Sequence, residues 1–192
     1  MPVKYVNRRG QTYYLHKGKT KTGKPKYFFS LKTEGTLADK IPDGFEIYEN
    51  PDAQVFLRRT LPKIITDAEK SVVEKGMKEF AKCKYSVVDI KGNTITVFIA
   101  NQDVDEFSEI FKFSPMKHTK PDIDTVFNQI VSYSPKMQFV LVDKDKRLFI
   151  TKRFCYLGSV DDWIEISGPD TLENLVKKYV KHIDKDSYYE LF

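Results

Sequence analysis

Apolar and polar positions alternate over much of the first sixty residues, in short runs separated by Gly, Pro, Asn and Asp. A period of two places successive side chains on opposite faces of a β-strand. The pattern predicts strands over residues 2–7, 11–16, 26–32 and 45–49. A glycine-punctuated turn is predicted over residues 17–24, and residues 54–59 fit either a short strand or a helix.

The spacing of apolar residues becomes helical after residue 62. Thr66 and Glu69 form a capping box, in which a side-chain oxygen accepts from the free N–H groups at a helix start. Apolar residues at helical spacing then predict a helix over about residues 67–82. The same spacing predicts helices over residues 103–112 and 123–132, and an amphipathic C-terminal helix that follows Asp170.

Between these helices the chain returns to strand-like patterns. Residues 84–90 and 94–100 flank Lys91-Gly92-Asn93, which is a typical hairpin turn. Residues 138–158 predict a longer hairpin that turns at residues 143–146, and Trp163 belongs to one more short strand.

Helices and antiparallel strands therefore mix without the regular alternation of a parallel sheet, and we predict an α+β fold. It would consist of a small, antiparallel, β-rich N-terminal part over residues 1–62 and an α+β body over residues 63–192. Residues 114–122 contain two prolines and few apolar side chains, so they are the candidate for a further boundary within the body.

Composition places the chain among globular proteins. Of its 192 residues, 41% are hydrophobic and 14% aromatic, which is enough to bury a sizeable core. No apolar run reaches the length of a membrane span, and the N-terminus lacks the apolar core of a signal peptide. Cys83 and Cys155 lie far apart and form no CxxC pair, and we interpret them as two buried thiols rather than as a disulfide. We expect a cytoplasmic protein without a membrane partner or a cofactor.

Charge is distributed unevenly along the chain. Residues 1–34 contain nine basic residues and one acid, Glu34, whereas the other 158 residues contain 23 basic and 26 acidic residues. The whole chain has a net charge of +5. This asymmetry indicates that the N-terminal region meets an anionic partner.

The stretch GKTKTGKP at residues 18–25 resembles a phosphate-binding P-loop in its spacing of Gly18, Gly23 and Lys24. A P-loop needs Ser or Thr at the next position, where this chain has Pro25, and a helix after the loop. The residues that follow are aromatic and strand-like. The stretch is therefore interpreted either as a solvated hairpin tip or as a basic finger that contacts nucleic-acid phosphates.

The leading hypothesis is a non-enzymatic protein that binds DNA or RNA through this basic hairpin. Lysines would pair with phosphates, and neighbouring aromatic rings would stack or pack, with Tyr13, Tyr14, Tyr27 and Phe28 as the candidates. The predicted nucleic-acid-binding residues are Arg8, Arg9, Tyr14, His16, Lys17, Lys19, Lys21, Lys24 and Lys26. No catalytic or metal-binding residue is predicted.

Two alternatives remain open. Asp89 and Lys91 resemble the second half of a metal-dependent nuclease site, with Glu74, Glu79 or Asp52 as the first carboxylate. The same residues are also common beside a hairpin turn for purely geometric reasons. The second alternative is a protein-interaction module whose basic loop meets an acidic protein partner.

Three stretches of the chain resemble a family of bacterial hypothetical proteins, and the similarity spans most of the sequence. They are YYLHKGKTKTGKPKYFFS at residues 13–30, FEIYENPDAQVFLRR at residues 45–59 and RFCYLGSVDDW at residues 153–163. The resemblance implies a bacterial, soluble, intracellular protein. It transfers no catalytic residue, because the family has no assigned activity.

Overall fold

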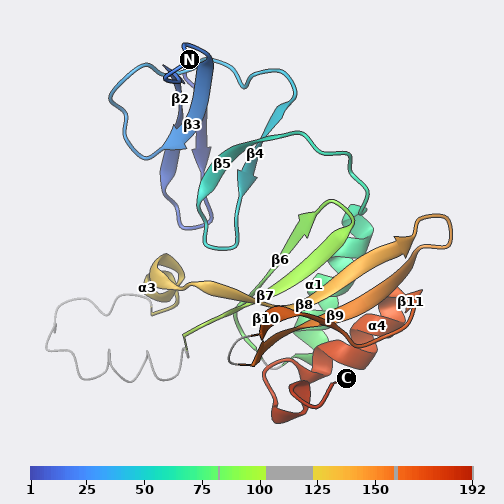
Figure 1. Ribbon diagram of the computed structural model, residues 1–192. Helices are drawn as coiled ribbons and strands as arrows, with labels where there is room; N and C mark the ends of the chain where they lie inside the picture. The colour runs from blue at the N-terminus through green and yellow to red at the C-terminus, as the bar shows by residue number, and fades with distance from the viewer. Residues whose placement is uncertain (82, 103–122, 158–159, 192) are drawn as a thin grey trace, which may run out of the picture. The chain divides into compact units, whose positions relative to one another are not determined.

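The computed structural model describes residues 1–81, 83–102, 123–157 and 160–191. The chain forms two compact units (Figure 1). Unit 1 comprises Met1–Leu61 with Val104–Val131, and unit 2 comprises Pro62–Asp103 with Ser132–Phe192.

The described residues form eleven strands and three α-helices, and each named strand pair is antiparallel. The predicted mixed α+β fold is thereby confirmed. The helix predicted over residues 103–112 and the candidate boundary at residues 114–122 lie outside the described residues.

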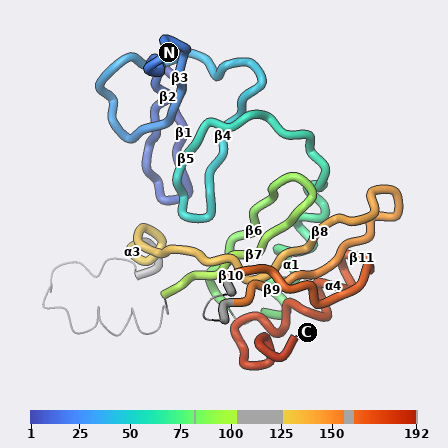
Figure 2. Tube along the Cα trace, in the orientation of Figure 1, coloured from blue at the N-terminus to red at the C-terminus, as the bar shows by residue number. Residues whose placement is uncertain are grey.

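Unit 1 contains a three-stranded sheet and a separate hairpin, which Figure 2 traces along the chain. The sheet has β2 between β1 and β3, and the hairpin joins β4 to β5. Their bounds are β1 Lys4–Val6, β2 Thr12–Lys19, β3 Pro25–Ser30, β4 Phe45–Glu49 and β5 Val55–Arg59. The undecided residues 54–59 thus supply a strand, and the predicted helix after residue 122 is α3, Ile123–Ile130.

The central strand β2 has partners along both edges over most of its length. One edge pairs with β3, and the other pairs first with β1 and then with residues 36–38. The Lys17 N–H donates to the Thr36 carbonyl at 2.9 Å, and the Ala38 N–H donates to the Leu15 carbonyl at 2.8 Å. Beyond Lys17, β2 pairs with β3 alone, so the end of the β2–β3 hairpin is a two-stranded ribbon.

Unit 2 is a six-stranded sheet in the order β10-β9-β8-β7-β6, with β11 also paired to β9, and its helices α1 and α4 cover one face (Figure 1). The strands are β6 Ser86–Lys91, β7 Thr94–Ala100, β8 Tyr133–Asp143, β9 Leu148–Leu157, β10 Val160–Glu165 and β11 Asp170–Thr171. The helices are α1 Asp67–Phe80 and α4 Leu172–Tyr179, and two 3-10 turns follow, Val180–His182 and Asp186–Tyr188.

The predicted capping box at the start of α1 is present and has a further partner. Thr66 Oγ1 accepts from the Glu69 N–H at 3.2 Å, and the Glu69 carboxylate accepts from the Thr66 N–H at 2.8 Å. Arg147, in the turn between β8 and β9, donates to the same carboxylate at 2.9 Å and 2.5 Å. Partial burial alone would raise the pKa of Glu69, but the hydrogen bonds from Arg147 and Thr66 outweigh it and hold that pKa below its usual range. This contact therefore fastens the first turn of α1 to the sheet.

The two helices of unit 2 meet at a glycine. Gly76 on α1 is buried against α4, and a Cβ placed on it would overlap Val176 Cγ1. A side chain at this position would force the helices apart, because packed interiors have little free volume.

We expect Gly76→Ala to lower the free energy of unfolding of unit 2, although alanine favours helices. Overpacking costs about 1–3 kcal/mol, whereas the gain in helix propensity is about 1 kcal/mol. The measurement is urea denaturation followed through Trp163, which is the single tryptophan of the chain. Gly168→Ala is the matched control, since a Cβ there meets nothing within 4 Å.

In a double-mutant cycle, Val176→Ala should relieve part of the cost of Gly76→Ala, since it removes the overlapping methyl group. Strictly additive losses in the cycle would contradict this packing account.

Candidate nucleic-acid interface

The basic stretch forms the tip of the β2–β3 hairpin. Lys19 pairs with Pro25, and the five residues between them close the loop. The Thr20 N–H donates to the Lys24 carbonyl at 2.8 Å, and the Gly23 N–H donates to the Thr20 carbonyl at 2.9 Å. Gly23 has a φ of 80°, which a side chain would strain, so glycine is required here. The turn is shorter than the predicted 17–24, because Lys17 and Lys19 belong to β2.

This geometry excludes a P-loop. The element that follows Lys24 is the strand β3, whereas a P-loop directs the N-terminus of a helix at the phosphate.

The five predicted lysines of the hairpin are all exposed. Strand alternation places Lys17 and Lys19 on one face and Lys26 on the other, while Lys21 and Lys24 lie in the loop. Among the described residues, no carboxylate forms an ion pair with any of these five ammonium groups. The end of the hairpin is therefore a concentrated positive charge without internal neutralisation.

The strand register also sorts the aromatic residues. Tyr5, Tyr13 and Tyr27 lie on the same face as the fully buried Leu15. The Tyr5 hydroxyl donates to Glu49 at 3.0 Å, so this face is turned toward the β4–β5 hairpin. Burial, together with the Glu49 carboxylate, raises the pKa of Tyr5. These three aromatic residues are partly buried.

Tyr14, His16 and Phe28 lie on the opposite face of the sheet. His16 is only 6% exposed; its Nε2 lies 2.9 Å from the Lys32 carbonyl oxygen, and its ring stacks on Phe28. Tyr14 is partly buried in register with Lys4 and Ser30. Phe28 is the ring that reaches solvent, with 42% of the residue exposed. His16 therefore packs within the unit, and a ligand on this face meets Phe28 first.

Both predicted arginines donate hydrogen bonds to main-chain carbonyls of unit 1. Arg8 donates to the carbonyls of Asn50 and Pro51 and lies 3.3 Å from a Glu49 carboxylate oxygen. Arg9 donates to the Val131 carbonyl. These guanidinium groups bind main-chain oxygens far away in sequence, so we assign them a role in stability.

The nuclease alternative pairs Asp89 with Glu74, Glu79 or Asp52, and the described strand and helix positions bear on the first two. Asp89 lies between Val88 and Ile90 on β6, and Val88 is part of the core under α1 and α4. Alternation then turns Asp89 to the face of the sheet opposite α1, which bears Glu74 and Glu79. In the part of the chain that the structure describes, no three His, Cys, Asp or Glu residues form a cluster that could hold a metal ion.

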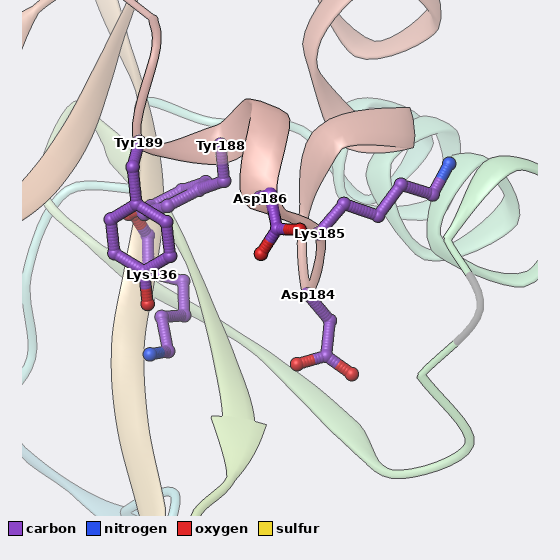
Figure 3. A pocket seen from close by; sticks show the side chains of 6 residues that line it. All are labelled: Lys136, Asp184, Lys185, Asp186, Tyr188 and Tyr189. Carbon is purple, nitrogen blue, oxygen red and sulfur yellow. The ribbon is translucent and has the colours of Figure 1, made fainter.

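A small pocket of about 220 Å³ lies in unit 2 and is shown in Figure 3. Its lining residues are Lys136, Asp184, Lys185, Asp186, Tyr188 and Tyr189. The Tyr188 hydroxyl is occupied by main-chain groups, accepting from the Phe154 N–H at 3.1 Å and donating to the Lys136 carbonyl at 2.5 Å. Burial raises the pKa of Tyr188 to about 12. This tyrosine is therefore a poor general acid or base at neutral pH.

The nearby cysteine does not supply a nucleophile. Burial, with a smaller contribution from the Asp184 carboxylate, raises the pKa of the Cys83 thiol to about 11. At neutral pH the thiol is protonated, and the thiolate is the reactive form. The lining of the pocket combines acidic and basic side chains.

No protein-family model, curated protein or solved structure matches this chain. The resemblance to bacterial hypothetical proteins stays a prediction. No helix within the described segments is long and apolar enough to cross a membrane.

Substitution of the predicted arginines should lower stability, whereas substitution of the exposed hairpin lysines should not. Arg8→Ala should lower the stability of unit 1 by about 1–2 kcal/mol, because it removes hydrogen bonds from a charged donor to main-chain carbonyls. Lys21→Ala should change stability by less than about 0.5 kcal/mol, as is usual for exposed sites. Thermal melts followed by far-UV circular dichroism compare the two variants, and equal melting curves would contradict the structural role of Arg8.

Proposed function

We propose that the protein binds nucleic acid through the end of the β2–β3 hairpin. Lys17, Lys19, Lys21, Lys24 and Lys26 would contact the phosphates. The observation behind this proposal is that these five exposed ammonium groups lie within ten residues and have no carboxylate partner among the described residues. Phosphates supply the missing counter-charge, and release of their condensed cations drives binding.

The proposal is for a binding protein rather than an enzyme, and it includes the cytoplasmic location expected from the sequence. DNA and RNA present the same phosphate chemistry to lysine, so this observation supports both equally. An acidic protein partner is the alternative, since carboxylates also pair with lysine. Competition of bound, labelled oligonucleotide by polyglutamate and by unlabelled oligonucleotide at matched charge distinguishes the two.

The test is fluorescence anisotropy of the full chain with labelled oligonucleotides over a range of salt concentrations. Lys19→Ala, Lys21→Ala and Lys24→Ala combined should weaken binding to all sequences alike, since phosphates carry no sequence information. The slope of log affinity against log salt should become shallower by about 2 to 3, because each lost phosphate contact removes about 0.7 on single strands and 0.9 on duplexes.

A matched triple variant controls for net charge. Lys144→Ala, Lys146→Ala and Lys177→Ala combined remove the same charge from exposed positions of unit 2. This control should bind with the wild-type slope. Equal weakening by the two triple variants would mean that overall charge, and not the hairpin, determines binding.

A further inference from the structure

The ring of Phe28 is an exposed aromatic surface within the basic hairpin. It is stacked on His16 with the ring centroids 5.2 Å apart and the planes at 13°. His16 is itself buried and lies 2.9 Å from the Lys32 carbonyl, so the ring is supported by a fixed neighbour. Such support lowers the conformational entropy that ligand binding would otherwise cost.

The residues beside the ring are a glycine and a lysine. Gly18 lies across the hairpin from Lys26, and it adds no side chain beside Phe28, where a Cβ would be in contact with Cε1 at 4.0 Å. The Lys26 ammonium lies 5.7 Å from the centroid of the Phe28 ring. This lysine is exposed and flexible, so it can turn from the ring to a phosphate when a base takes its place.

We propose that the ligand is a single strand of nucleic acid, with one unpaired base stacked on Phe28 and the adjoining phosphate held by Lys26. The inference rests on the proposed function and adds the strandedness of the ligand. Inside a duplex the faces of the bases are covered by their neighbours, so a phenyl ring on the protein surface cannot reach them. An unpaired base has a free π-face, and stacking on aromatic side chains is the usual way in which proteins hold it.

A second exposed ring in unit 1, that of Phe56, serves for comparison. Phe56, on β5, is 46% exposed, but its strand pairs with β4, whose Glu46 forms an ion pair with Arg58. The face of the sheet that contains Tyr5 lies toward β4–β5, whereas Phe28 lies on the opposite face. Phe56 is therefore a control of similar size and exposure without a lysine cluster.

The experiment compares labelled 20-nucleotide dT and U single strands with their complementary duplexes, using the full chain. Wild-type protein should prefer both single strands to the duplexes. Phe28→Leu should weaken single-strand binding about tenfold, which is the usual scale for the loss of one stacked base, and should leave duplex binding within about twofold. The salt slope should stay at its wild-type value, because no phosphate contact is lost.

Phe28→Tyr should retain the preference, since it keeps the ring, and Phe56→Leu should bind as the wild type does. Unequal affinity for the dT and U strands, which differ in the sugar and in the C5 methyl group of the base, would show which nucleotide the site prefers, and either order supports the inference. Duplex binding as tight as single-strand binding, or no effect of Phe28→Leu on the single strands, would overturn it. In those cases the effect of the hairpin lysine variant still tests the proposed function on its own. No binding of any probe would overturn both.

A spectroscopic variant covers the case in which Phe28→Leu fails to fold. Phe28→Trp combined with Trp163→Phe places the only indole of the chain at the proposed stacking position. Saturating dT single strand should quench its emission, because the base covers the ring, while duplex at equal occupancy should not. Unchanged emission with bound single strand would contradict stacking at this residue.

Discussion

Side chains of β2 and β3 alternate between two faces of one sheet, and this constraint gives the sheet one face toward the β4–β5 hairpin and an opposite face that bears Phe28. Leu15, Tyr13 and Tyr27 share the face that closes over the β4–β5 hairpin. The alternate positions, His16 and Phe28, must then lie on the other side. A slip of one residue between β2 and β3 would instead place Phe28 on the same face as Leu15. The exposed ring is thus a consequence of the same pairing that forms the core.

The paired edges of β2 explain where the charge accumulates. Residues 36–38 and β1 cover one edge as far as Lys17, and the remaining strand pair extends without a third partner. Lysine side chains there have solvent on both faces and avoid the desolvation that burial would impose. A concentrated cluster of like charge raises the energy of the isolated protein, and an anionic ligand relieves it. The local fold therefore places the cations where a polyanion can reach them.

Unit 2 is organised by packing and by a structural ion pair. Its apolar strand faces and helices α1 and α4 form one core, and Arg147 binds the Glu69 carboxylate that caps α1. Burial raises the pKa of Tyr188 and of the Cys83 thiol, and Asp89 lies on the face of the sheet opposite α1, which bears Glu74 and Glu79. We attribute the proposed recognition to unit 1 for these reasons.

Local signals in the sequence predicted much of the fold. The capping box at Thr66 and the apolar periods identified α1 and the α+β class, because both depend on neighbours within one turn or one strand. The prediction that this strand ends at residue 16 was wrong, because β2 continues to Lys19. The lysines and the glycine at residues 17–19 have low strand propensity, and their pairing with β3 makes them part of the strand. The contacts of Arg8 with carbonyls more than forty residues away leave no sequence pattern. The choice of Phe28 as the stacking residue among the four candidate aromatic residues likewise required the pairing register of β2 with β3.

The most direct measurement is a ¹H–¹⁵N NMR titration of the full chain with a single-stranded oligonucleotide. Binding at the hairpin predicts that the largest amide shifts fall within Lys17–Phe28, with smaller changes at Lys32 and Gly35 behind His16. Amides of the β6–β10 sheet should keep their positions. Shifts concentrated in unit 2, or no shifts at saturating oligonucleotide, would contradict the account.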